Sequence, residues 1–303
     1  MKRRIGIAGA GAWGHALAHV AGLAGHHVSI WSRGQEPAAQ LSQSDAIILA
    51  VPAQAAREVL QAIRPVVTDG LPLIISAKGI EQTTGLFINE VVAEIVPQAR
   101  AMVLSGPSFA ADVIRGLPTA VVLASAMLAE AGEWAEALSI PSFRIYKSDD
   151  VRGVEIGGAL KNVLAIACGI ADGRGLGDSA RAALTTRGFA ELTRFGRKLG
   201  ARPETLMGLS GLGDLLLTCS SRQSRNYAFG LAIGEGASVT QAQAQSKGVV
   251  EGAFTVKVAF ELALRHQVEM PIVDAVHAIV DRHARPDEEI AKLLARPAGR
   301  EIR

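Results

Sequence analysis

Three glycines near the start of the chain, Gly9, Gly11 and Gly14, have the spacing G-x-G-x-x-G. They follow a short apolar run at residues 4–8 and open a segment of helical periodicity at residues 13–23. At such a junction the first glycine allows a tight turn, the second lets backbone approach a pyrophosphate, and the third lets the helix pack on the strand. A turn without a ligand is the alternative, but the flanking strand and helix favour a dinucleotide-binding turn.

Short β-rich runs alternate with helical stretches in the first half of the chain, as is typical of a parallel sheet covered by helices. The predicted strands span residues 4–8, 27–31, 46–50, 72–76, 101–105, 119–123 and 143–146, and the predicted helices include 13–23, 54–66 and 84–96. Later segments read only as helices, at 154–171, 179–199, 228–233, 253–265 and 271–281. The expected fold class is an α/β Rossmann-type parallel-sheet domain followed by an all-α domain. Residues 1–148 would bind the dinucleotide, and residues 149–303 would form the helical substrate-binding and catalytic domain.

Composition excludes several classes of protein. The 303 residues include 31 Lys plus Arg and 29 Asp plus Glu, a net charge of +2, and 49% are apolar. Disorder is excluded by the apolar content, and the balanced charge gives no basis for nucleic-acid binding. Cys168 and Cys219 form no C-x-x-C motif, which favours a reducing cytoplasm. Glycines interrupt the N-terminal apolar stretch where a signal peptide would be uninterrupted, and no apolar run approaches the ~18 residues of a transmembrane segment.

The end of the second predicted strand bears on the choice of dinucleotide. An NAD site usually has an acidic residue there for the ribose 2′-hydroxyl, whereas this chain has Trp31-Ser32-Arg33. Arg33 can pair with a 2′-phosphate, so NADP is favoured over NAD, although an ordinary solvated arginine is the alternative. His15 and His19 have the i, i+4 spacing of metal ligands, but no third ligand is evident. No metal site is predicted.

One lysine lies in the middle of an otherwise apolar helix. The helical neighbours of Lys161 are small, Gly157, Gly158, Ala165 and Cys168, which predicts a shallow trough open to a ligand. If Lys161 is buried, its pKa is lowered towards the range of acid–base catalysis. The alternative, which explains the sequence equally well, is a lysine whose stem lies on a core helix while its ammonium reaches solvent. Asp214, placed among glycines and leucines, is the obvious partner for this charge.

The tripeptide Ser224-Arg225-Asn226 follows Asp214 closely. It offers a hydroxyl, a guanidinium and an amide, a set suited to phosphate oxygens. A solvated turn is the alternative for this segment taken alone.

Together these residues resemble bacterial NAD(P)-dependent glycerol-3-phosphate dehydrogenase over nearly the whole chain. The resemblance is carried, in the family's order, by the segments 9–14, 77–79, 105–110, 158–162, 211–215, 224–226 and 249–252. It implies reversible reduction of dihydroxyacetone phosphate to sn-glycerol 3-phosphate with NADP or NAD, which supplies phospholipid synthesis.

The resemblance also implies roles for particular residues. Lys161 would be the general acid/base, Lys78 would reach both cofactor and substrate, and Asp214 would hold Lys161. The remaining substrate contacts would be Gly106, Ser108, Asn162, Thr218, Ser224, Arg225 and Asn226. The cofactor contacts would be Gly9, Gly11, Ala12, Trp13, Gly14, Arg33, Pro52, Lys78, Ala110, Arg225, Val249 and Glu251.

Two features depart from the family pattern. The segment between Arg33 and Asp45 is shorter than usual, which opens the adenosine side of the site and bears on the NADP preference. Arg174 adds a charge to a loop expected near the substrate, where it would assist anion binding or face solvent.

Two other functions compete with the dehydrogenase. They are a related reductase acting on another small acid or sugar phosphate, and a dinucleotide sensor without turnover; a sensor has no need of a buried Lys–Asp pair. The apolar helix at 154–171 would be either central in its domain or part of an interface, so a homodimer is possible.

Overall fold

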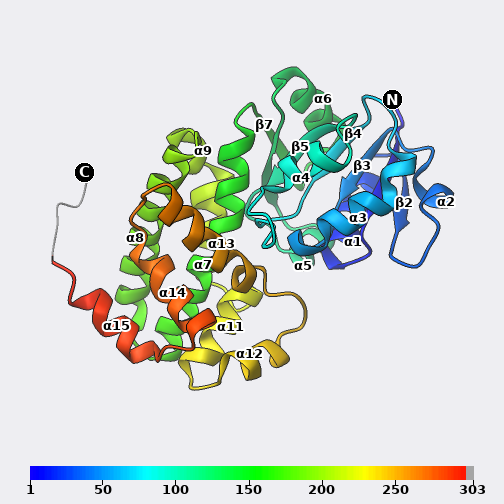
Figure 1. Ribbon diagram of the computed structural model, residues 1–303. Coiled ribbons are helices and arrows are strands. Elements are labelled where there is room, and N and C mark those ends of the chain that lie inside the picture. The colour runs from blue at the N-terminus through cyan, green and yellow to red at the C-terminus, as the bar shows by residue number, and fades with distance from the viewer. Residues whose placement is uncertain (298–303) are drawn as a thin grey trace.

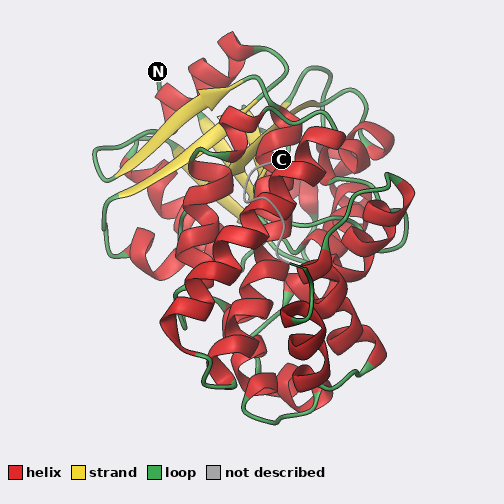
Figure 2. Ribbon diagram, turned by 90° about the vertical axis from the view of Figure 1, so that its left-hand side faces the viewer, coloured by secondary structure: helices red, strands yellow, loops and turns green. Residues whose placement is uncertain are grey.

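The computed structural model describes residues 1–297 as a sheet layered with helices, joined to a group of helices (Figures 1 and 2). Seven strands form one sheet in the order β2-β1-β3-β4-β5-β6-β7. Their bounds are β1 Arg4–Ala8, β2 His27–Trp31, β3 Ala46–Leu49, β4 Pro72–Ile75, β5 Arg100–Ser105, β6 Thr119–Ala124 and β7 Phe143–Ser148. All seven predicted strands are confirmed, with ends that differ by at most two residues.

Helices cover both faces of the sheet. They are α1 Ala12–Leu23, α2 Pro37–Leu41, α3 Ala56–Ile63, α4 Ile88–Ile95, α5 Ala110–Ile114 and α6 Leu128–Leu138. Side chains alternate along each strand, so in β3 Ile47 and Leu49 belong to the core beneath α3 and α4, whereas Ala46 and Ile48 belong to the core beneath α1, α5 and α6. The inner strands β3 and β4 are buried along their whole length, and such strands read as continuous apolar runs, which the sequence shows clearly.

Two predicted helices in this part are shorter than expected. The stretch predicted as 54–66 is α3 flanked by two single 3₁₀ turns, Ala53–Ala55 and Arg64–Val66, and Pro65 lies in the second of them. The helix predicted from residue 84 begins at Ile88, because residues 81–86 form a turn in which Glu81 N–H donates to the Leu86 carbonyl at 2.9 Å.

The sequence predicts a wholly parallel sheet, and this prediction is wrong at one strand. Strand β6 runs antiparallel to β5. The link between these two strands holds only the five-residue α5, whose length of about 7.5 Å does not carry the chain back along the sheet. Strand β7 is parallel to β6, so it ends at the edge opposite to the ends of β1 to β5. The following helix therefore starts at that opposite edge and runs back towards the glycine-rich turn.

That helix, α7 (Val151–Gly173), is the centre of the helical part of the chain (Figure 1). Asp150 caps its N-terminus by accepting from Gly153 N–H at 2.8 Å. Around it lie α8 Gly177–Lys198, α9 Pro203–Leu206, a π-helical turn at Leu209–Gly213, α10 Asp214–Cys219, α11 Arg225–Gly234, α12 Val239–Gln245, α13 Glu251–Arg265, α14 Pro271–Arg282 and α15 Pro286–Leu294.

Helix α7 is long and apolar enough to cross a membrane by length and composition, contrary to the expectation that no segment would be. The apolar window is entirely buried inside the fold, as in the central helix of a globular domain. Of the two positions that the sequence left open for this helix, the structure selects the central one.

Candidate active site

The glycine-rich turn joins β1 to α1 with the geometry that its spacing predicts. Gly9 has φ +128°, and a Cβ there would lie 2.4 Å from the Ala50 carbonyl oxygen. A Cβ on Gly14 would lie 1.9 Å from the Gly9 carbonyl oxygen, so α1 can start this close to the strand only without a side chain. Gly9 N–H also donates to the Trp31 carbonyl at 2.9 Å, which places the end of β2 beside the turn.

The surroundings of this turn fit a dinucleotide. Gly11 has no atom within 4 Å of the position of an added Cβ, so the N-terminus of α1 has open space in front of it. Two buried polar atoms nearby lack hydrogen-bond partners among the described residues, the indole Nε1 of Trp13 and Oε2 of Glu251. Both residues were predicted to contact the cofactor. A free helix N-terminus and unpartnered polar atoms are features that a bound pyrophosphate and its nucleosides would satisfy.

Two lysines share one buried carboxylate at the same edge of the sheet. Lys161 Nζ donates to Asp214 Oδ1 at 2.7 Å, and Lys78 Nζ donates to Asp214 Oδ2 at 2.7 Å. Lys78 follows the end of β4, Lys161 lies in the middle of α7, and Asp214 begins α10. The pairing of Lys161 with Asp214 is the contact that the sequence predicts, whereas the position of Lys78 on the second carboxylate oxygen was not foreseen.

Each ammonium keeps one hydrogen for a ligand. Besides Asp214, Lys161 donates to Thr218 Oγ1 at 2.9 Å, and Lys78 donates to the Gly106 carbonyl at 2.8 Å. An ammonium has three N–H donors, so one remains on each lysine after these bonds. The site thus holds two donors beside a single counter-charge, an arrangement suited to an oxygen that becomes negative.

Burial lowers the pKa of Lys161 to about 8, and the neighbouring Lys78 charge acts in the same direction, while Asp214 opposes both. The side chain is 9% exposed. A pKa near 8 allows the group to hold a proton at neutral pH and to give it up readily, as general acid–base catalysis requires.

The shallow trough predicted around Lys161 is filled by protein. A Cβ on Gly157 would lie 2.5 Å from the Ser210 carbonyl oxygen, and a Cβ on Gly158 would lie 2.7 Å from Ser105 Oγ. The small residues therefore serve close packing of α7 on its neighbours, and the sequence interpretation of an open trough was wrong.

A chain of side-chain amides links the loop that carries Lys78 to the start of α13. Asn162 Nδ2 donates to the Lys78 carbonyl at 3.1 Å, and Asn226 Nδ2 donates to Asn162 Oδ1 at 2.8 Å. Gly252 N–H then donates to Asn226 Oδ1 at 2.8 Å. The two asparagines, predicted as substrate contacts, thus have their amides engaged with protein and fix the loop that carries Lys78.

The other predicted substrate and cofactor contacts border this centre. Gly106 has φ +146°, and a Cβ there would lie 2.8 Å from Val121 Cα; Ser108 Oγ donates to its carbonyl at 3.0 Å. Ser224 caps α11, and the exposed Arg225 is the first residue of that helix. Ala110 begins α5, Ala12 begins α1, Pro52 precedes the turn at Ala53–Ala55, and Val249 is half-buried before α13.

Glu251 connects the helical part to the sheet domain. Its Oε1 accepts from Ala53 N–H at 3.0 Å, and burial raises the pKa of its carboxyl to about 7. The predicted cofactor contact is therefore also a contact between the two parts of the chain.

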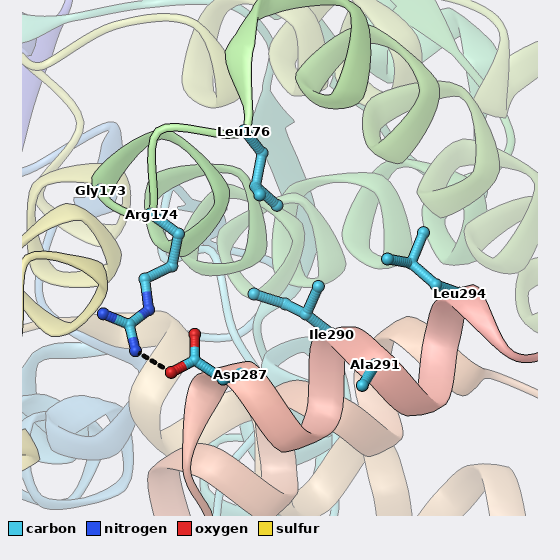
Figure 3. Close-up of a pocket in the computed structure, with 7 residues that line it drawn as sticks. All are labelled: Gly173, Arg174, Leu176, Asp287, Ile290, Ala291 and Leu294. Carbon is cyan, nitrogen blue, oxygen red and sulfur yellow. Dashed lines mark hydrogen bonds and ion pairs between the residues drawn. The ribbon is translucent and has the colours of Figure 1, made fainter.

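Arg174 does not lie near the lysines. It follows the last residue of α7, thirteen residues beyond Lys161, which is about 20 Å along a helix. Its guanidinium pairs with Asp287 of α15 and donates to the Gly234 carbonyl at 3.3 Å. Figure 3 shows this pair beside Leu176, Ile290 and Leu294. With Gly173 and Ala291, these residues line a shallow pocket of about 370 Å³. The expectation that this loop borders the substrate was wrong.

In the part of the chain that the structure describes, no group of three His, Cys, Asp or Glu is placed to hold an ion. His15 Nδ1 lies 3.0 Å from the Gly11 carbonyl oxygen, and both His15 and His19 are exposed.

Several polar groups near the site were missed by the sequence analysis. Ser105, Ser210 and Thr255 have buried hydroxyls without partners among residues 1–297. Glu58 of α3 lies 3.8 Å from Arg33 and is 69% exposed. No local pattern marks these positions, because each acquires its neighbours from a distant segment.

Hydride transfer from a dinucleotide to a carbonyl needs a pyrophosphate site and a proton donor at one place. The carboxyl edge of this sheet provides both, so the fold and site define a dinucleotide-dependent dehydrogenase with a Rossmann-type and a helical part. Family models described as the N-terminus and C-terminus of NAD-dependent glycerol-3-phosphate dehydrogenase match residues 4–45 and 35–131, and residues 150–291, respectively. The chain belongs to this family.

Similar proteins and solved structures carry the name of the same family. A glycerol-3-phosphate dehydrogenase [NAD(P)+] from Parvibaculum lavamentivorans is 48% identical over 97% of both chains, and one from Brucella ovis is 47% identical over 98% of both. The crystal structure of glycerol-3-phosphate dehydrogenase from Coxiella burnetii has a TM-score of 0.92 at 38% identity, covering 97% of this chain and 99% of that one. A more distant solved structure, from Ralstonia solanacearum, shares the fold at 18% identity and a TM-score of 0.62, covering 94% of this chain and 98% of that one.

The family model and the alignment with a relative both agree with a chain that is shorter than the family pattern in the segment after Arg33. The N-terminal family model matches in two pieces that overlap at residues 35–45, as happens when a chain lacks part of the family's sequence. The alignment with the Parvibaculum protein has 323 positions, more than the 303 residues of this chain.

Proposed function

We propose that this chain catalyses the reversible reduction of dihydroxyacetone phosphate to sn-glycerol 3-phosphate with NADPH or NADH. The observation that carries the proposal is the pair of lysines bridged by Asp214 beside the glycine-rich turn. The names of the relatives supply the substrate, and the site supplies groups that suit its chemistry. The product supplies glycerophospholipid synthesis.

The cofactor, when bound, supplies or accepts the hydride. Lys161 protonates the carbonyl oxygen as negative charge develops on it, and Lys78 stabilises the same charge. Asp214 holds both ammonium groups in place, and Thr218 fixes the second hydrogen of Lys161. In the oxidation direction Lys161 takes the hydroxyl proton instead.

The phosphate of the substrate orients the carbonyl from a distance. Arg225 at the N-terminus of α11 supports this part of the proposal, because a guanidinium at a helix N-terminus favours an anion. Ser224 and Ser108 provide hydroxyls beside it and beside Gly106. The remaining predicted contacts keep the roles given to them by the family resemblance.

The test is the loss of nicotinamide absorbance with dihydroxyacetone phosphate, with NADPH and NADH in parallel, for the wild-type chain and Lys161→Ala. Turnover that disappears in the variant while cofactor still binds supports the proposal. A wild-type chain that binds NADPH and leaves dihydroxyacetone phosphate unreduced would falsify it, and other phosphorylated ketones or small acids would then be the substrates to assay.

The domain division is also part of this proposal. Residues 1–148 and 149–303 are proposed as the two domains, supported by the last strand ending at Ser148 and α7 beginning at Val151.

Location and oligomeric state are two further expectations. A cytoplasmic location is supported by the two cysteines, Cys168 and Cys219, which are free and buried. The homodimer loses the support of α7, which is buried within one chain, and sedimentation against the chain mass of 31.6 kDa tests it.

A further inference from the structure

An acidic side chain lies beside the arginine that the sequence assigns to the cofactor. Glu58 Oε2 lies 3.8 Å from a guanidinium nitrogen of Arg33, and the two side chains are 69% and 73% exposed. Both groups therefore face solvent at the surface of the sheet domain and are free to meet a ligand.

The position of this pair is fixed by the glycine-rich turn. Gly9 N–H donates to the Trp31 carbonyl, so the end of β2 lies against the turn, and Arg33 is two residues further along the chain. Glu58 lies in the first turn of α3, in the segment that follows the end of β3. In Rossmann-type folds, the end of the second strand is where the adenosine ribose and any 2′-phosphate are recognised.

The neighbouring segments do not cover Arg33 and Glu58, and the adjacent Arg57 makes its ion pairs with other residues. The link after Arg33 contains only the five-residue helix α2. Arg57, the residue before Glu58, is engaged elsewhere, since it donates to Glu81 at 2.9 Å and to Glu94 at 2.9 Å. A dinucleotide whose adenosine lay at the end of β2 would therefore meet one cation, Arg33, and one anion, Glu58.

We propose that Glu58 is a specificity-determining residue that weakens the preference for NADP set by Arg33. A 2′-phosphate carries up to two negative charges, so it gains from Arg33 and is repelled by Glu58, whereas a 2′-hydroxyl has no such penalty. The opposed charges let the site accept both dinucleotides. This inference rests on the proposed function only in that both require a dinucleotide at this turn.

The test is the ratio of the dissociation constants for NADH and NADPH, measured by quenching of tryptophan fluorescence without substrate. Glu58→Gln removes the charge and keeps the shape, and it is expected to raise the preference for NADPH about three- to tenfold at low ionic strength, with a smaller effect at high salt. Arg33→Ala is expected to change the ratio in the opposite direction.

The matched control is Glu136→Gln on α6, an equal change of charge at an exposed position of a helix that packs on β6 and β7. An unchanged ratio in Glu58→Gln, or an equal rise in Glu136→Gln, overturns the proposal. Because binding is measured without turnover, a chain that shows the expected ratios but does not reduce dihydroxyacetone phosphate would contradict the proposed function and leave this inference standing.

Discussion

Asp214 is the residue on which the proposed chemistry depends, because its two oxygens hold two ammonium groups that would otherwise repel each other. It is fully buried, and a buried carboxylate without cationic partners would be costly. The same arrangement leaves each lysine one free N–H. The two ammonium groups and the one carboxylate together carry one excess positive charge, which suits an anionic transition state.

Removal of the Lys161 ammonium is expected to abolish most turnover and leave cofactor binding in place. Lys161→Ala should lower kcat by at least about 10³-fold, because it removes both the proton donor and a stabilising charge. Steady-state kinetics measure the loss, and far-UV circular dichroism with NADPH fluorescence shows whether the variant is folded. A kcat within tenfold of wild type would rule out the assigned role.

The lowered pKa of Lys161 predicts opposite pH profiles for the two directions. Reduction needs the protonated amine, so kcat/KM for dihydroxyacetone phosphate should fall as pH rises through about 8, whereas oxidation of glycerol 3-phosphate should rise through the same range. Initial rates between pH 6 and pH 10 give both profiles. Profiles that bend in the same sense in both directions would exclude Lys161 as the acid/base.

At the scale of elements, α7 combines Lys161, the proposed acid/base, with close packing against its neighbours. Its glycines lie where neighbouring backbones touch the helix; a Cβ on Gly169 would lie 2.1 Å from the Tyr227 carbonyl oxygen. Lys161, ten residues after the start of the helix, is carried about 15 Å from one sheet edge towards the other, where Lys78 lies. The antiparallel β6 makes this possible, because it places the start of α7 at the far edge.

Gly169→Ala is expected to destabilise the fold by about 1–3 kcal/mol, because backbone rather than a flexible side chain occupies the space. Gly22→Ala in α1 is the matched control, since nothing lies within 4 Å of its added Cβ. There alanine should stabilise by about 0.5–1 kcal/mol through helix propensity. Urea unfolding measures both, and equal effects in the two variants would contradict this account of α7.

Helix α7 also carries a buried carboxyl where it meets the sheet domain. Glu155 accepts from Asn89 N–H of α4 at 3.0 Å, and burial raises the pKa of its carboxyl to about 8. Between pH 4.5 and 8 the unfolded chain is ionised at this residue and the folded chain is not, so the contribution of Glu155 to stability is lost as pH rises through this range.

Glu155→Gln removes this titration and keeps the acceptor for Asn89. The variant is expected to be more stable than wild type by about 4 kcal/mol at pH 8, with the difference nearly absent at pH 4.5. The free energy of unfolding in urea at the two pH values measures it. A difference of the same size at both would show that Glu155 is not protonated in the folded chain.

At the scale of the whole molecule, the site forms where the two parts of the chain meet. Lys78 and the glycine-rich turn come from the sheet domain, whereas Lys161, Asp214 and Glu251 come from the helices. The far end of the helical part has a different role, because Arg174 ties the end of α7 to α15 beside the pocket in Figure 3.

Arg174→Ala is accordingly expected to leave kcat and KM within twofold of wild type. It should reduce stability by less than about 1 kcal/mol, because the ion pair with Asp287 is partly exposed. Asp287→Asn is the matched change on the partner side. A KM for dihydroxyacetone phosphate raised tenfold in Arg174→Ala alone would restore the anion-binding role that the position in the fold argues against.

The sequence by itself determined the strands, the glycine-rich turn and the family, because apolar runs buried on two faces and fixed spacings such as G-x-G-x-x-G are local patterns. Only the tertiary structure decided the direction of β6, the filled space beside Lys161, the position of Lys78 on Asp214 and the place of Arg174. Each of these depends on segments distant in the chain, and no local periodicity records which of them will meet. The same reason explains why Glu58 beside Arg33 could be recognised only once the chain was folded.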